Sequence, residues 1–201
     1  MRRANEALIV IDVQNDFCPG GALAVAGGNE IIHLINSLMI EFPAVILTQD
    51  WHPRDHSSFA SQHPGFDAFG LIEMDYGMQV LWPDHCIQGS HGAALHAGLK
   101  TNNADLIIRK GFNREIDSYS AFFENDHKTP TGLEGYLRTR GLDTLTFVGL
   151  ATDFCVSYSA QDAAKLGFKA TVRTDLCRAI DLDGSLATAM EQMTHAGVTL
   201  K

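Results

Sequence analysis

The sequence predicts an α/β fold, a doubly wound parallel sheet with helices on both faces. Two observations lead to this prediction. Short apolar runs alternate along the chain with longer stretches that carry apolar residues at helical spacing. The short runs are apolar throughout rather than alternating, which is typical of strands buried on both faces of a parallel sheet.

The N-terminal elements follow this alternation. ALIVI at residues 7–11 is expected to be the first strand, residues 29–42 the first helix, and AVILT at residues 44–48 the second strand. Residues 50–103 then break the rhythm, with weak periodicity and many His, Pro, Gly and Ser. Because a compact domain rarely carries so long an irregular stretch without a functional reason, we expect it to form a site or a lid.

The C-terminal half returns to the alternation. Further strands are expected at residues 106–109, 144–148, 169–173 and 198–200, and helices at residues 132–140, 153–166 and 184–195. The run at 145–148 is β-branched and aromatic, as in a buried strand, and residues 153–166 have apolar residues at helical spacing.

Composition limits the function classes. At 201 residues the chain suits one domain, residues 1–201, with a core that needs no disulfide or metal. A formal charge of −9 argues against nucleic acid or an anionic membrane as a partner. The N-terminus resembles neither a signal peptide nor a membrane span, so a cytoplasmic protein is expected. The residues leave open whether the protein forms a homo-oligomer. The four scattered cysteines suggest free thiols.

Reactive residue types follow four of the predicted strands. They are Asp12 after the first strand, Asp50 and His52 after the second, Lys110 after the third, and Ala151 and Cys155 after the fourth. Ligands bind beyond the carboxyl ends of strands in open α/β sheets, so these residues are expected to share one site.

Cys155 is the candidate nucleophile. It lies at the junction of a strand and a helix, where backbone N–H groups and the helix dipole stabilise a thiolate. Asp12, at the end of a buried strand, suits a general base, and Lys110 would hold both anions and depress the pKa of the thiol. Taken alone, Asp12 also fits a turn cap and Lys110 a solvated strand end.

A second group of residues has the types that bind metals. Asp50, His52 and the distant His85, with His56 nearby, form a carboxylate and imidazole set typical of open zinc or non-haem iron sites. Histidines in such a Pro-rich loop are equally well explained as exposed residues. The remaining histidines are expected to be bystanders: His33, His63, His91, His96, His127 and His195.

Five apolar or aromatic residues are candidates for the wall of a flat substrate pocket, although each also suits an ordinary core: Phe17, Leu23, Trp82, Tyr119 and Phe154. The glycine pairs at residues 20–21 and 27–28 fit no phosphate-binding pattern and are expected in turns. Cys18, Cys86 and Cys177 are expected to be small buried residues.

Six motifs carry a family resemblance. DVQNDF at 12–17, QDWHP at 49–53, WPDHC at 82–86, RKG at 109–111, DSYSAFF at 117–123 and GLATDFCV at 149–156 occur in this order over nearly the whole chain. Together they resemble the nicotinamidase/pyrazinamidase branch of the isochorismatase-like cysteine hydrolases. The resemblance implies a six-stranded parallel sheet with a long metal-binding loop.

The resemblance also implies roles for individual residues. Asp12, Lys110 and Cys155 would be the catalytic triad, and the backbone N–H groups of Ala151 and Cys155 an oxyanion hole, with a cis peptide between residues 150 and 151. Asp50, His52 and His85 would hold a divalent metal, Zn²⁺ first and Fe²⁺ or Mn²⁺ as alternatives. The fourth protein ligand stays open among His56, Ser57 and Ser58.

The activity implied is hydrolysis of nicotinamide to nicotinate and ammonia through a cysteine thioester, as in NAD salvage, with the metal orienting the pyridine ring. Deamidation of pyrazinamide is expected as well. The alternatives are a related amidase for a carbamoyl group or another small amide, a metallohydrolase in which Cys155 is structural, and a non-catalytic protein on an inactivated hydrolase fold. The intact residues Asp12, Lys110 and Cys155 argue against the last.

Overall fold

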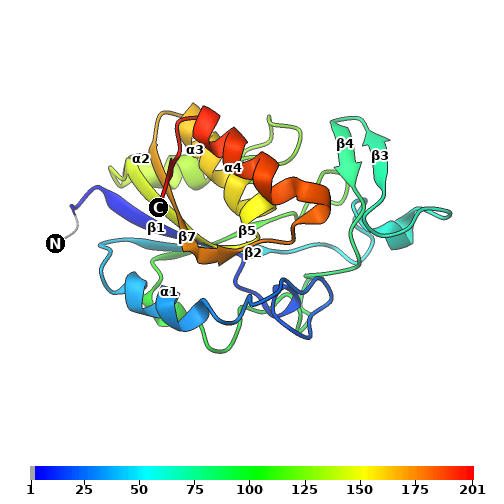
Figure 1. Cartoon of the computed structure of the whole chain (residues 1–201), viewed down its shortest axis with the longest axis horizontal. Helices are drawn as coiled ribbons and strands as arrows, with labels where there is room; N and C mark the ends of the chain where they lie inside the picture. The colour runs from blue at the N-terminus through cyan, green and yellow to red at the C-terminus, as the bar shows by residue number, and fades with distance from the viewer. Residues whose placement is uncertain (1–2) are drawn as a thin grey trace.

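A six-stranded parallel sheet forms the centre of the computed structural model, which describes residues 3–201 (Figure 1). Its strands are β1 (Glu6–Ile11), β2 (Val45–Asp50), β5 (Leu106–Lys110), β6 (Thr144–Leu150), β7 (Lys169–Arg178) and β8 (Thr199–Leu200). They lie in the order β5-β2-β1-β6-β7-β8, with every neighbouring pair parallel.

Helices cover both faces of this sheet. They are α1 (Ile32–Met39), α2 (Leu133–Thr139), α3 (Ser157–Lys165) and α4 (Ser185–His195). In Figure 1, α1 lies on one side of the sheet, and α2, α3 and α4 lie on the other. The predicted fold class is confirmed. That residues 1–201 form one domain stays a prediction, and residues 1 and 2 lie outside the described part.

The strand order places a switch point between β1 and β6. From β1 the chain proceeds outward through β2 to β5, and from β6 it proceeds the other way through β7 to β8. The two central strands are buried along nearly their whole length, and their ends are aligned by pairing of Ile11 with Gly149. Parallel sheets bind ligands at such a point, beyond the carboxyl ends of the strands.

Several predicted boundaries were wrong. The first helix, expected at 29–42, is limited to Ile32–Met39 because i to i−3 bonds, Ile32 N–H to Asn29 and Phe42 N–H to Met39, tighten both ends. Pro43 then disfavours a helical Phe42. Strand β7 runs five residues beyond the predicted end at 173, past an irregularity in its pairing with β6.

The helix expected at 153–166 has two parts. Thr152–Val156 form a π-helical turn, in which the Val156 N–H reaches back to the Ala151 carbonyl, and α3 follows at Ser157. Cys155 therefore lies in a widened turn, not in the first turn of an α-helix. Such π turns occur often at functional sites.

The irregular segment contains one element that the sequence did not reveal. Strands β3 (Leu71–Met74) and β4 (Gly77–Val80) form an antiparallel hairpin that projects beside the sheet (Figure 1). Short 3₁₀ turns occupy Asn15–Phe17, Ala60–Gln62, Thr101–Asn103 and Leu182–Gly184. Among residues 3–201, no helix has the length and apolar character needed to cross a membrane.

Candidate active site

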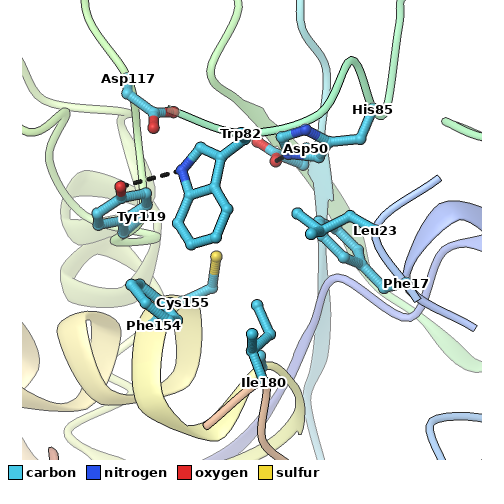
Figure 2. Close-up of a pocket in the computed structure, with 11 residues that line it drawn as sticks. Phe17, Leu23, Asp50, Trp82, His85, Asp117, Tyr119, Phe154, Cys155 and Ile180 are labelled. Carbon is cyan, nitrogen blue, oxygen red and sulfur yellow. Dashed lines mark hydrogen bonds and ion pairs between the residues drawn. The ribbon is translucent and has the colours of Figure 1, made fainter. Parts of the chain in front are cut away.

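Cys155 faces a pocket at the switch point of the sheet (Figure 2). The pocket is lined by Phe17, Leu23, Asp50, Trp82, His85, Asp117, Tyr119, Ala151, Phe154, Cys155 and Ile180. The peptide between Leu150 and Ala151 is cis, as the resemblance implies. Residues from four strand ends and from the long irregular segment thus meet around one thiol.

Lys110 joins the predicted catalytic residues. Its side chain is 1% exposed, and Nζ lies 2.9 Å from Asp12 Oδ2 and 3.2 Å from Asp50 Oδ1. The same ammonium donates to the Ser118 carbonyl at 2.8 Å and to Cys155 Sγ at 3.5 Å. One buried cation therefore contacts both carboxylates and the thiol.

Asp12 is held in place by Thr48 on the neighbouring strand. The Thr48 hydroxyl donates to Asp12 Oδ1 at 2.5 Å, and the Asp12 N–H donates to the same hydroxyl at 3.0 Å. Asp12 has φ of 45°, in the left-handed region, which turns the chain sharply at the end of β1. Burial raises its pKa, and Lys110 offsets part of the rise.

The thiol departs from the expectation of a depressed pKa. Burial raises the pKa of Cys155 well above its usual range, and the opposing effect of Lys110 is smaller. Burial also acts to lower the pKa of Lys110, but Asp12 and Asp50 outweigh it and the net shift is upward. The resting site therefore holds a protonated thiol beside an ammonium, and the thiol needs a base.

Asp50, His52 and His85 form a cluster that suits a metal ion. Nε2 of His52 lies 2.9 Å and Nε2 of His85 3.4 Å from Asp50 Oδ2, and all three residues are buried. Each imidazole places Nδ1 at 2.8 Å from a backbone carbonyl, of Gly111 and of Pro83. A carbonyl only accepts, so the hydrogen is on Nδ1 and the Nε2 lone pair of a neutral ring faces Asp50.

These donors fit a divalent ion. Two imidazole lone pairs and a carboxylate oxygen directed at one another repel unless a cation lies among them. Without a metal ion, a proton on His52 can reduce this repulsion. Burial acts to lower the pKa of His52, but the Asp50 carboxylate outweighs burial and the net shift of the pKa is upward. Two nitrogens and one oxygen with further positions open are a ligand set that suits zinc and iron.

The candidates for a fourth ligand differ in position. His56 is fully buried and its Nε2 has no hydrogen-bond partner, while its Nδ1 lies 2.8 Å from the Ser58 hydroxyl. The Ser58 N–H donates to the same Nδ1 at 3.2 Å; a tautomer with its hydrogen on Nδ1 gives up that bond, donates to the Ser58 hydroxyl and leaves Nε2 available to a metal. The Ser58 hydroxyl is thereby engaged by His56, whereas the Ser57 hydroxyl oxygen, like His56 Nε2, is buried without a hydrogen-bond partner in residues 3–201. Imidazole nitrogen is the more usual ligand of zinc and iron, which favours His56 over Ser57.

The pocket wall contains all five predicted wall residues. The Trp82 indole donates to the Tyr119 hydroxyl at 3.1 Å, and both rings meet Phe154 edge to face (Figure 2). Phe17 and Leu23 lie on the opposite side of the pocket (Figure 2). Their roles toward a substrate stay predictions.

Sequence reasoning missed several residues of the site. Asp117 and Ile180 line the pocket, and Asp117 is the first residue of the quoted DSYSAFF motif. Gln14, within DVQNDF, accepts from the Asp50 N–H at 2.7 Å and donates to the Asp50 carbonyl at 2.8 Å. A buried amide beside a strand end gives no signal of its own in a sequence. The bystander histidines enter no metal cluster within residues 3–201.

The remaining cysteines behave as predicted. Cys18, Cys86 and Cys177 are buried and free, and burial raises the pKa of each thiol, that of Cys177 to about 12. They are protonated at neutral pH, away from the pocket lining.

Comparison with known proteins supplies the family. The family model of the isochorismatase domain matches residues 6–200. The nicotinamidase of Acinetobacter baylyi is 56% identical over 98% of this chain and 93% of its own length. A solved Acinetobacter baumanii nicotinamidase and pyrazinamidase superimposes with a TM-score of 0.98 at 57% identity, covering 100% of this chain and 97% of that one.

A more distant structure contains a metal. The pyrazinamidase of Pyrococcus horikoshii, solved in complex with zinc, has a TM-score of 0.79 at 32% identity and covers 98% of each chain. The residues matched by the family model, 6–200, include the whole six-stranded sheet and the grouped side chains of Asp12, Lys110 and Cys155. The chain belongs to the isochorismatase family.

Proposed function

We propose that this protein is a nicotinamidase, which hydrolyses nicotinamide to nicotinate and ammonia. The observation that carries the proposal is the contact of Lys110 with both Asp12 and Cys155 beside an aromatic pocket. A flat aromatic amide suits walls made of Trp82, Tyr119 and Phe154. The high identity to nicotinamidases over nearly the whole chain supports the same substrate.

The first half of the reaction makes a thioester. Asp12 takes the proton of the Cys155 thiol as sulfur attacks the carboxamide carbon. The ammonium of Lys110 stabilises the developing thiolate, and the backbone N–H groups of Ala151 and Cys155 hold the oxyanion. Each such donor contributes about 3 kcal/mol to stabilising the transition state. Asp12 then passes its proton to the departing amine, which leaves as ammonia.

The second half releases the acid. Asp12, again a carboxylate, removes a proton from water, and the hydroxide attacks the thioester carbon. The carbon–sulfur bond breaks, the thiolate regains the proton from Asp12, and nicotinate leaves. Because Asp12 both accepts and returns each proton, its raised pKa suits the two roles.

Asp50, His52 and His85 are the residues that would hold a divalent metal, with His56 as the fourth ligand. Zn²⁺ is our first choice, and Fe²⁺ and Mn²⁺ suit similar donors. When bound, the metal would supply Lewis acidity toward the pyridine nitrogen, which would orient the ring. The protein's own residues carry out the proton transfers and the attack.

Ammonia release from nicotinamide, measured in a single turnover, tests the proposal. Cys155→Ala should reduce the rate on the order of 10⁴-fold or more, because it removes the nucleophile. Cys177→Ala, which removes a buried thiol outside the pocket, should retain near-normal activity. Ammonia release by Cys155→Ala at the normal rate contradicts the thiol mechanism.

Substrate and mechanism alternatives are separated by two further measurements. A panel of nicotinamide, pyrazinamide and an N-carbamoyl amino acid should give turnover for the first two only. Alkylation of Cys155 should abolish activity, whereas a metallohydrolase with a structural cysteine would survive it.

A further inference from the structure

Asp117 is a buried carboxylate in the pocket wall to which the mechanism gives no role. It is 2% exposed, and Figure 2 shows it above the Trp82 and Tyr119 rings. Two neutral groups donate to it, the Ser118 N–H at 2.8 Å and the Gln79 amide at 2.8 Å. Neutral donors stabilise a buried carboxylate but do not balance its charge, so a cation is needed nearby.

The position of Asp117 relates it to the candidate metal centre. A carboxylate oxygen of Asp117 and nitrogens of His52 and His56 all lie within 4.8 Å of one another. His52 belongs also to the cluster with Asp50 and His85, so the two groups share one imidazole. Asp117 thus approaches the metal centre from the His52 and His56 side, outside the set formed with Asp50.

The charge balance of the site points the same way. Asp12, Asp50 and Asp117 are three buried carboxylates, and Lys110 is the buried ammonium that contacts the first two. With neutral imidazoles and a protonated thiol, these groups sum to a charge of −2. A divalent cation brings the buried site to neutrality, and Asp117 supplies the charge that neither Lys110 nor a hydrogen-bond donor offsets.

We propose that Asp117 is a positioning residue for the metal: its charge retains the divalent cation that Asp50, His52 and His85 bind. This inference rests on the metal site of the proposed function. Removal of a charged or hydrogen-bonding partner outside the ligand set weakens metal binding about 10- to 100-fold in other proteins.

Metal affinity tests the proposal without any substrate. The dissociation constant for Zn²⁺ is measured by competition with a chromogenic chelator, and metal retention by elemental analysis after dialysis. Asp117→Asn should raise the dissociation constant about tenfold or more. Asp117→Glu, which keeps the charge, should restore most of the affinity, and Asp50→Asn should lose more.

Two controls separate the charge from the packing. Gln79→Ala removes the hydrogen bond to Asp117 but keeps its charge, so the affinity for Zn²⁺ should stay within about threefold of the wild type. Glu124→Gln neutralises another buried carboxylate of the same loop, one that accepts from Asn113 and joins neither metal cluster in residues 3–201. It should also bind normally.

The outcomes decide between the alternatives. Should Asp117→Asn fail to fold, as judged by circular dichroism, Asp117→Ser replaces it. Wild-type affinity in a folded neutral variant, or equal losses in Gln79→Ala, overturns the proposal, as does a wild-type protein that binds no metal. Ammonia release by the wild type is measured separately, so loss of the proposed function and loss of this inference are distinguishable.

Discussion

The thiol of Cys155 is subject to opposing influences. Burial, Asp12 and Asp50 raise its pKa, and Lys110 lowers it, with a net rise well above the usual range. A helix terminus and a lysine, the features visible in the sequence, favour a thiolate. The structure adds burial of Cys155, which is 7% exposed, and burial favours the neutral thiol. In the proposed mechanism, proton removal by Asp12 therefore accompanies attack, since little thiolate is present beforehand.

Alkylation should reveal this protonated state. Below the thiol pKa, the thiolate fraction rises about tenfold per pH unit. Because burial raises the pKa of Cys155 well above its usual range, its rate of reaction with iodoacetamide should keep rising from pH 7 to pH 9 without a plateau. Mass spectrometry locates the modification, and Cys155→Ala controls for other sites. A plateau below pH 8 would show a depressed pKa and contradict this prediction.

Lys110 should matter for stability as well as activity. Lys110→Met leaves Asp12 and Asp50 buried without their common cation, and such a loss costs about 3–5 kcal/mol. Urea unfolding of the metal-free proteins measures this change in the free energy of unfolding. Lys165→Met removes an ion pair in which the lysine is 62% exposed, so it should change stability by less than about 1 kcal/mol. Equal effects of the two substitutions would contradict a buried charge network.

At the scale of elements, the sequence predicted the parts that position the site. Uniformly apolar strands revealed β1, β2 and β6, and the polar residues at their ends then had to meet at one sheet edge. The hairpin β3–β4 escaped prediction because its apolar residues do not mark a buried face: Leu71 is 59% and Met78 65% exposed. The π turn was missed because an extra residue per turn leaves no compositional sign.

The junction of β1 and β6 depends on Gly149. Its φ is +118°, and a Cβ there would collide with the Ile11 carbonyl oxygen. This oxygen belongs to the backbone of β1, so it cannot shift without distorting the strand. Gly149→Ala should therefore combine strain and overpacking and cost about 2–5 kcal/mol. Because Ala151 and Cys155 follow directly, we expect activity to fall as well. Urea unfolding and ammonia release measure the two effects.

Gly167 offers the matched control for that prediction. Its φ is +86°, but nothing lies within 4 Å of the position that a Cβ would take, so Gly167→Ala should cost only the backbone strain, about 1 kcal/mol. Activity should be unchanged. If both alanine variants lose the same stability, close approach of β1 to β6 is not the cause.

At the scale of the whole molecule, the candidate metal site connects the irregular segment, residues 50–103, to the central sheet. Asp50 ends β2, whereas His85 belongs to the distant WPDHC motif. Gln14 adds a second tie, because its amide contacts both Asp50 and the Ala93 carbonyl. The sequence predicted which residues of this segment could bind a metal. It did not predict the balance of charge among the buried carboxylates and Lys110, because Asp117 lies in another loop. Long-range neighbours such as these are set by the fold alone.

Metal binding should therefore stabilise the whole protein. A ligand present at about 100 times its dissociation constant adds about 2.7 kcal/mol to the free energy of unfolding, which corresponds to a rise in Tm of about 5–10 °C for a chain of this size. Calorimetry of chelated and Zn²⁺-loaded protein measures the shift. Asp50→Asn should abolish most of it, since Asp50 is the carboxylate shared by both imidazoles.

Hydrogen exchange locates the effect. Removal of the metal should increase amide exchange first in residues 52–88, which are linked to the sheet through His52 and His85, and leave the buried strands β1 and β6 protected. Besides this site, hydrogen bonds from Ser57, Gln79 and Cys86 join the segment to Arg114, Asp117 and Asp16, so the metal adds to existing contacts. Uniform loss of protection, or an unchanged Tm on chelation, would show that the metal does not fasten the segment to the sheet.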